Sequence, residues 1–175
     1  ITEAVHNINS NLIVSCALMP ETTSNAYYYG QDYSVISKYM DVVVPMIYKG
    51  NYGKTTTWIT STTKWFVDNS KGAVVWAGLQ SYNSDSNTAK LSLTALTTDV
   101  QAAINAGATG SILFRWGLSK IVDFKNLNTA SVVPATGSVT SVETIIALLT
   151  VAAPVRVTRT APHKFCRLTE LPSDA

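Results

Sequence analysis

Four short runs of almost uninterrupted apolar residues divide the first two thirds of the chain, at 12–18, 41–48, 73–79 and 111–115. A strand with one solvated face alternates apolar and polar residues, whereas these runs scarcely alternate. The runs therefore predict strands that are covered on both faces, as in a parallel sheet. Their first residues lie about 30 to 38 positions apart, which leaves room for a helix in each interval.

The intervals between these runs carry the spacing of helices. Inward-facing apolar residues recur at helical spacing, at Trp58, Trp65 and Phe66 in one interval and at Leu93, Leu96, Val100 and Ile104 in the next. Gly107 follows the second set where a helix should end, and a third, shorter helix is predicted over 33–39. The alternation predicts an α/β fold with a parallel sheet, either doubly wound or part of a (β/α)8 barrel.

The composition of the chain changes after residue 127. Residues 128–141 are mostly small and polar with Pro and Gly, which is typical of a linker. A short helix from Ser141 would have to end before Pro154, and no periodicity follows it. We therefore expect a βα domain at 1–127, a linker at 128–141 and a tail at 142–175.

Composition and charge exclude several kinds of partner. Only 14% of the residues are charged, against roughly 25% in an average soluble protein, while 39 are Ser or Thr. A net charge of +2 is too small for nucleic acid or an anionic membrane surface, and no apolar run spans a bilayer. We infer an extracellular or cell-surface protein. Because Ile1 is not a start residue, we also expect an excised piece of a longer chain.

The sequence predicts neither a metal site nor a cofactor. Cys16 and Cys166 lie far apart, and His6 and His163 stand at no spacing that is usual for zinc. No glycine-rich phosphate loop opens a helix, which argues against a doubly wound nucleotide-binding domain.

Candidate chemistry lies directly after the four apolar runs, because ligands of parallel α/β folds bind at the carboxyl ends of the strands. These positions combine aromatic rings, an amide and a few charges: Glu21, then Tyr48 and Lys49, then Gln80 and Tyr82, and finally Arg115 and Trp116. Such a mixture suits a sugar, whose C–H faces stack on rings while its hydroxyls form hydrogen bonds. Glu21 is the candidate catalytic carboxylate, and the other six are candidate substrate-binding residues.

Four segments in order resemble a known family of barrels, at 29–33, 41–48, 75–82 and 110–116. The second, an Asp and an apolar run ending in Met46-Ile47-Tyr48, is similar to the sixth strand of chitinase-like (family 18 type) barrels and related polysaccharide hydrolases. The two segments that follow it in the chain, 75–82 and 110–116, are similar to strands seven and eight of the same barrels. The resemblance implies that residues 1–127 are the C-terminal half, about strands five to eight, of a (β/α)8 TIM barrel whose parent chain hydrolyses O-glycosyl bonds.

The chain departs from that family at the catalytic acid. The family's acidic strand-four motif would precede Ile1, and Lys49 stands where the family usually has an Asp after Met-x-Tyr. We therefore expect a fragment of a hydrolase of cell-wall or N-acetyl-sugar glycans, with its main general acid upstream. The alternative is a non-catalytic carbohydrate-binding or adhesive surface module. A half-barrel has unpaired edges, so its partner is the missing N-terminal half-barrel or a second copy.

The tail carries a second resemblance. Residues 141–146, with Leu171 and Pro172 later, are similar to the opening and closing of cell-wall-binding repeats from surface proteins of some methanogenic archaea. An unstructured tail is the alternative.

Three polar residues, Asp32, Asp41 and Arg115, have structural interpretations. We expect Asp32 to cap the helix at 33–39, and Asp41 to have a structural role at the amino end of its strand. Arg115 should pair with a carboxylate rather than take part in catalysis, and His6 has no partner that the sequence reveals. For Glu21 the sequence leaves open a general acid or a solvated loop residue.

Overall fold

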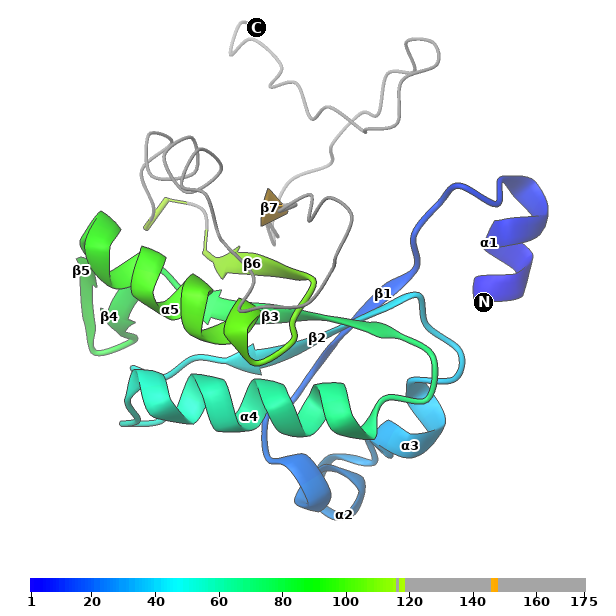
Figure 1. Ribbon diagram of the computed structural model, residues 1–175, viewed down its shortest axis with the longest axis horizontal. Helices are drawn as coiled ribbons and strands as arrows, with labels where there is room; N and C mark the ends of the chain where they lie inside the picture. Colours follow the sequence, from blue (N-terminus) through cyan, green and yellow to red (C-terminus); the bar gives the residue numbers. More distant parts are fainter. Residues whose placement is uncertain (116, 119–145, 148–175) are drawn as a thin grey trace, which may run out of the picture.

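The computed structural model describes residues 1–115, 117–118 and 146–147, and a parallel sheet lies at its centre (Figure 1). The sheet consists of β1 (Ser15–Leu18), β2 (Val42–Ile47), β3 (Val74–Gln80), β6 (Gly110–Phe114) and the two-residue β7 (Ile146–Ala147). Its order is β1-β2-β3-β6-β7, with every neighbouring pair parallel. A separate antiparallel hairpin, β4 (Tyr82–Ser84) with β5 (Asn87–Lys90), follows β3. The four predicted strands and their parallel arrangement are confirmed.

Helices occupy the intervals between the strands. α4 (Thr56–Asn69) and α5 (Leu93–Asn105) lie where the apolar spacing predicts them, and α3 (Tyr33–Ile36) is shorter than expected. Three further elements were not predicted: α1 (Thr2–Ile8), a 3-10 turn at Thr22–Ser24, and α2 (Asn25–Tyr29). α1 buries none of its residues, so it carries no apolar stripe by which it could be recognised.

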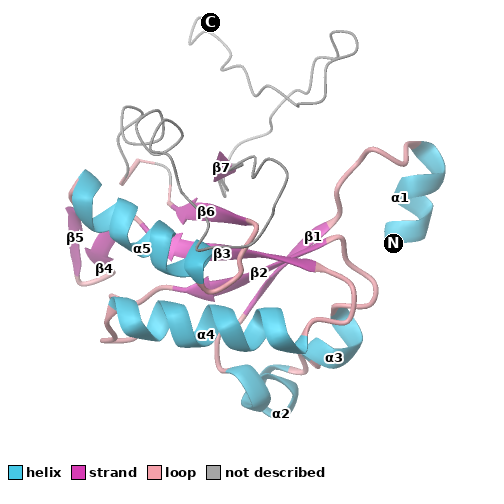
Figure 2. Ribbon diagram, in the orientation of Figure 1, coloured by secondary structure: helices cyan, strands magenta, loops and turns pink. Residues whose placement is uncertain are grey.

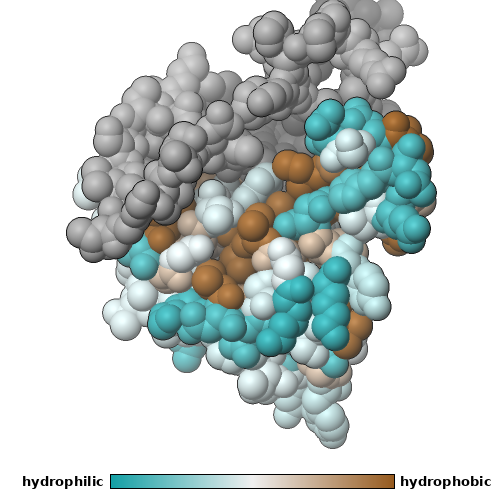
Figure 3. Space-filling model, turned by 45° about the vertical axis from the view of Figure 1, so that its right-hand side comes forward, coloured by the Kyte–Doolittle hydropathy of each residue, from teal (hydrophilic) through white to brown (hydrophobic). Residues whose placement is uncertain are grey.

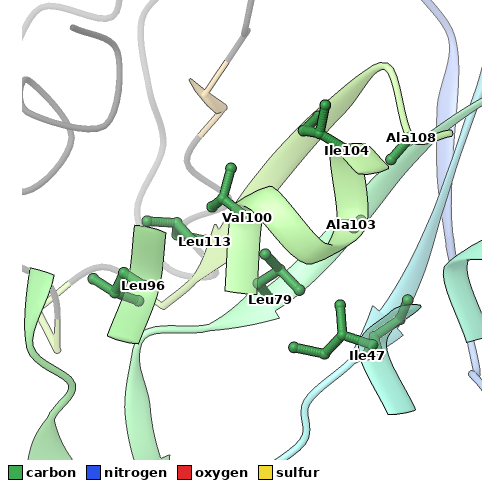
Figure 4. Close-up of a cluster of buried hydrophobic side chains, with 10 residues drawn as sticks. Ile47, Leu79, Leu96, Val100, Ala103, Ile104, Ala108 and Leu113 are labelled. Carbon is green, nitrogen blue, oxygen red and sulfur yellow. The ribbon is translucent and has the colours of Figure 1, made fainter. Parts of the chain in front are cut away.

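Of the helices between successive strands, α3, α4 and α5 pack on one face of the sheet (Figure 2). Large apolar side chains of three strands meet those of α4 and α5 there: Ile47, Leu79 and Leu113 from the sheet, with Ile59, Leu96 and Val100 from the helices (Figure 4). Nearer β1, Phe66 of α4 is fully buried, and its carbonyl accepts a hydrogen bond of 2.6 Å from Tyr33 Oη. Trp58 and Trp65 pack against these clusters, so the prediction that the aromatic residues of α4 belong to the core is confirmed.

The opposite face of the sheet is also apolar. Because side chains alternate along a strand, Val42, Val44 and Ile112 point away from α4 and α5, and they form a separate cluster with Trp76. Gly110 is required beside this cluster, since a Cβ there would lie 2.9 Å from the Trp76 ring. A doubly wound sheet reverses its strand order and carries helices on both faces. Among the described elements, strand order follows chain order and the crossover helices share one face.

Polar residues at the ends of elements behave largely as predicted. The Asp32 carboxylate accepts hydrogen bonds from Ser34 N at 2.9 Å and Ser34 Oγ at 2.7 Å, and these bonds lower its pKa. Asp41 Oδ2 accepts from Val14 N at 2.7 Å and fixes the segment before β1. His6, for which the sequence reveals no partner, contacts the same carboxylate, because its Nε2 lies 3.0 Å from Asp41 Oδ2. A contact across 35 positions of sequence leaves no local signal.

Exposed apolar side chains gather near the amino ends of the strands. They are Ile1, Ile8, Leu12, Ile13 and Val74. Figure 3 turns this side of the molecule forward and shows hydrophobic side chains in the middle of the face.

The tail differs from expectation at the two residues that the structure describes. Ile146 and Ala147 pair with Ser111 and Ile112 as β7, so at these positions the expected short helix is wrong. The predicted boundary at residue 127, the linker at 128–141 and the rest of the tail lie outside the described residues.

Candidate functional site

The carboxyl ends of β1, β2, β3 and β6 meet at one end of the sheet because the four strands run in parallel (Figure 1). The structure places the segments that carry the candidate residues there: Glu21, Tyr48, Lys49, Gln80, Tyr82 and Arg115. Trp116 lies outside the described residues.

Three rings form an aromatic cluster at this end: Tyr48, Tyr82 and Phe114. The Tyr48 and Phe114 rings stack with centroids 5.0 Å apart and an interplanar angle of 14°, and Tyr82 lies 6.4 Å from Phe114. The guanidinium of Arg115 lies 5.7 Å from the Tyr82 ring centroid, within the range of a cation–π interaction. Tyr82 is buried, whereas Tyr48 and Phe114 are half-buried, so the cluster is only partly enclosed.

Hydrogen bonds join Gln80 to the loop after β2 and to the β4–β5 hairpin. Gln80 Nε2 donates to Asn51 Oδ1 at 2.9 Å, and Asn51 N donates to Gln80 Oε1 at 3.2 Å. Asn51 Nδ2 donates to Asp85 Oδ2 at 2.8 Å, and Tyr82 Oη donates to Asp85 Oδ1 at 2.6 Å. Gly50 permits this close packing, since a Cβ there would overlap the Asn83 carbonyl. We call Gln80, Asn51 and Asp85 the amide network.

The Lys49 side chain binds residues of α4 and α5. Its Nζ lies 2.6 Å from Asp99 Oδ1 of α5, and it donates to Thr56 Oγ1 of α4 at 3.2 Å. The Thr56 hydroxyl in turn donates to Asp99 at 2.8 Å. The ammonium therefore has a structural function, and its contact with a sugar stays a prediction.

Glu21 connects two segments through tyrosine hydroxyls. Its Oε1 accepts from Tyr52 Oη at 2.8 Å and from Tyr29 Oη at 3.2 Å. Its Oε2 is buried and has no hydrogen-bond partner among the described residues. Glu21 is therefore not a freely solvated loop residue, because it ties α2 to the loop after β2. Its role as a general acid stays a prediction.

The tyrosines of this region remain neutral over an unusually wide pH range. Burial, with a smaller effect from Tyr82, raises the pKa of Tyr48 to about 12. Burial and then the hydrogen bond to Asp85 raise the pKa of Tyr82. The pKa of Tyr52 rises through burial and its hydrogen bond to Glu21. These phenols are thus hydrogen-bonding groups rather than charges at neutral pH.

Sequence reasoning did not identify Asp85 or Asp99 as residues of this region, and it placed Phe114 at the end of its strand without including it among the candidate binding residues. Asp85 lies in the polar run 83–87, which includes the turn between β4 and β5, and such a run is typical of a turn. Asp99 falls on the inner stripe of α5 beside Leu96 and Val100, where a carboxylate requires a partner. The sequence thus indicates a turn around Asp85 and a need for a partner at Asp99. It does not indicate which residue of another element each of them contacts.

The described residues provide no group of three His, Cys, Asp or Glu side chains that could hold a metal ion. None of the described helices is both long and apolar enough to cross a bilayer.

Together, the fold and this site define an α/β protein with a parallel sheet and a partly enclosed, aromatic, largely neutral surface at the carboxyl ends of its strands. No family model, no curated protein and no solved structure matches the chain.

Proposed function

We propose that the chain is the C-terminal half of a (β/α)8 polysaccharide-hydrolase-like barrel and binds cell-wall or N-acetyl-sugar glycans at the carboxyl ends of its strands. The observation that carries this proposal is the aromatic cluster beside the amide network, on loops and ends of successive parallel strands. Rings accept the C–H faces of sugars, and neutral amides and phenols bind sugar hydroxyls. A surface with few free charges at this end suits such a ligand.

The arrangement of the sheet supports a barrel half. Strand order follows chain order, and the crossover helices lie on one face, as they do around a barrel. The apolar cluster of Val42, Val44 and Ile112 would then face the barrel interior. β1 pairs only with β2 among the described strands, which leaves an edge for further strands. A preceding half-barrel or a second copy would supply these strands. The protein would act outside the cell or at its surface.

The described carboxylates favour binding over cleavage by this half. Asp99 is paired with Lys49, Asp85 accepts from Tyr82, and Glu21 accepts from Tyr52. A general acid must direct its proton at the glycosidic oxygen, whereas the free Oε2 of Glu21 is buried. We therefore place the main acid in the complementary half, with Glu21 as the local candidate.

The same observation favours a second candidate function, a non-catalytic carbohydrate-binding or adhesive surface module. Such a module needs no catalytic carboxylate, so it is consistent with Asp99, Asp85 and Glu21 each accepting hydrogen bonds within the protein. The two functions differ in one measurable property, the release of new reducing ends from a bound polysaccharide.

The test is sedimentation of the full chain with insoluble chitin, cellulose and cell-wall peptidoglycan. We expect the wild type to bind at least one of them and Tyr48→Ala to bind about threefold to tenfold more weakly, because a stacking surface is lost. Tyr39→Ala is the matched control, since Tyr39 lies before the amino end of β2 and is 63% exposed. It should bind like the wild type.

Circular dichroism melts would show that both variants fold. Failure of the wild type to bind any of the three polysaccharides would overturn the proposal. Release of reducing ends by the wild type, abolished in Glu21→Gln, would assign catalysis to this half and exclude the non-catalytic module.

A further inference from the structure

Three consecutive tyrosines on α2 are exposed. Tyr27, Tyr28 and Tyr29 have exposed fractions of 85%, 70% and 45%. The Tyr27 and Tyr28 rings meet at 4.9 Å and 85°, and the Tyr28 and Tyr29 rings are 6.4 Å apart. Folding gains little from rings that remain in water, so the core does not explain this cluster.

The exposed tyrosines join the aromatic cluster through a short series of contacts. Tyr29 and Tyr52 both donate to Glu21 Oε1, at 3.2 Å and 2.8 Å. Tyr52 belongs to the turn that begins at Tyr48, whose carbonyl accepts from Tyr52 N at 3.2 Å. Tyr48 stacks on Phe114. We call the two groups of rings that these contacts connect the aromatic track. Phe114 and Tyr48 stack at the carboxyl end of the sheet, and Tyr27, Tyr28 and Tyr29 meet on α2. Tyr52, whose ring packs on Trp58 at 5.2 Å, is joined to Tyr29 through the Glu21 carboxylate and to Tyr48 through the backbone.

The segment that carries α2 is neutral between Glu21 and Asp32, and both of these carboxylates accept hydrogen bonds within the protein. Residues 22–31 contain no charged side chain and no aliphatic side chain larger than Ala26. The hydroxyls of Tyr27 and Tyr28 make no hydrogen bond to any residue in the described part of the chain, so they can bind a ligand's polar groups. The cores of homodimer interfaces are more apolar than the rest of the protein surface, whereas residues 22–31 place only small or polar side chains beside the three rings. Aromatic rings with free hydroxyls present both an apolar face and a polar group, which suits a sugar.

We infer that Tyr27 and Tyr28 form an outer subsite for an extended glycan, with the sugar chain lying along the aromatic track from the carboxyl end of the sheet. This inference rests on the proposed function, and it assigns a second binding position to the same ligand. A short oligosaccharide occupies only the aromatic cluster, whereas a longer one reaches α2 and gains affinity there.

Isothermal titration of the full chain with N-acetylglucosamine and cellulose oligosaccharides, each as disaccharide and hexasaccharide, tests this inference. We expect the wild type to bind one hexasaccharide more tightly than its disaccharide. In Tyr27→Ala/Tyr28→Ala the hexasaccharide affinity should fall about tenfold, with disaccharide affinity unchanged, because two stacking contacts are lost. Tyr48→Ala should weaken both lengths, and Tyr39→Ala neither.

The outcomes separate the subsite from the proposed function. Equal hexasaccharide affinity of the double variant and the wild type would overturn the subsite and leave the proposed function intact. A wild type that binds none of the four oligosaccharides would overturn the subsite, and it would overturn the proposed function as well if the full chain also sediments with none of the three polysaccharides. If the double variant changes the elution volume in size-exclusion chromatography and not the hexasaccharide affinity, α2 is a self-association surface and the inference is wrong.

Discussion

Tyr48 shows how one residue joins the fold to the site. Its position directly after β2 makes it a candidate from sequence, because strand ends can be located from the apolar runs. Its stacking partner Phe114 lies 66 positions later and belongs to another strand, so no local pattern indicates the pair. Stacking on Phe114 and burial fix the ring while leaving it partly exposed. Such a ring is already held in place before a ligand arrives.

The burial of Tyr48 predicts a loss of stability at high pH. Its pKa rises from 10.0 to about 12, so folding favours the neutral phenol. That contribution is complete below pH 10 and disappears as the pH rises through 12. Between these values the free energy of unfolding of the wild type should fall about 1–2 kcal/mol further than that of Tyr48→Phe, allowing for partial exposure.

Urea denaturation at intervals of pH measures this difference. Tyr39→Phe serves as the control, since an exposed phenol should leave the wild-type profile unchanged. Superimposable alkaline profiles for Tyr48→Phe and the wild type would mean that Tyr48 is not buried as described.

At the scale of elements, sequence reasoning succeeded wherever a segment buries an apolar face. β2 and α5 bury most of their apolar residues, and both were located within a few positions. α1 buries nothing and the four residues of β5 are all exposed, so neither carries a periodic signal. The hairpin nevertheless positions Asp85 against Asn51. The site therefore depends partly on elements that hydrophobic patterning does not reveal.

One ion pair joins the loop after β2 to α5. Lys49 lies 2.6 Å from Asp99, whose side chain is 2% exposed. Lys49→Met would leave a buried carboxylate without its cation, and we expect a loss of about 3 kcal/mol in the free energy of unfolding. Adding Asp99→Asn should recover part of that loss, because the unpaired charge is removed.

The matched control is Lys64→Met. Lys64 pairs with Asp68 on the surface of α4, where the side chains are 64% and 53% exposed. Exposed pairs of this kind contribute about 0.3–0.5 kcal/mol, so chemical denaturation should separate the two Lys→Met variants clearly. Equal losses would show that the Lys49–Asp99 pair is solvated.

At the scale of the whole molecule, the two faces and the β1 edge of the described sheet bear on the proposed half-barrel. One face is covered by α4 and α5, whereas the other holds its own apolar cluster around Val44 and Trp76. The β1 edge has no second neighbour among the described strands. Parallel sheets are normally covered on both faces, and long exposed edges favour association. Strand order follows chain order, as the proposed half-barrel requires.

Association through the β1 edge is therefore expected in solution. Ala17 lies in β1, is exposed, and sits on the face opposite its neighbours Cys16 and Leu18, which pack under the helices. In size-exclusion chromatography with light scattering, the wild type should be larger than a monomer, and Ala17→Lys should shift it toward the monomer because a charge would enter the closing interface. Ser61→Lys, which adds the same charge to an exposed position of α4, should leave the assembly unchanged. A wild type that is a compact monomer with a cooperative thermal transition would contradict the proposed half-barrel, because the β1 edge would then need no partner.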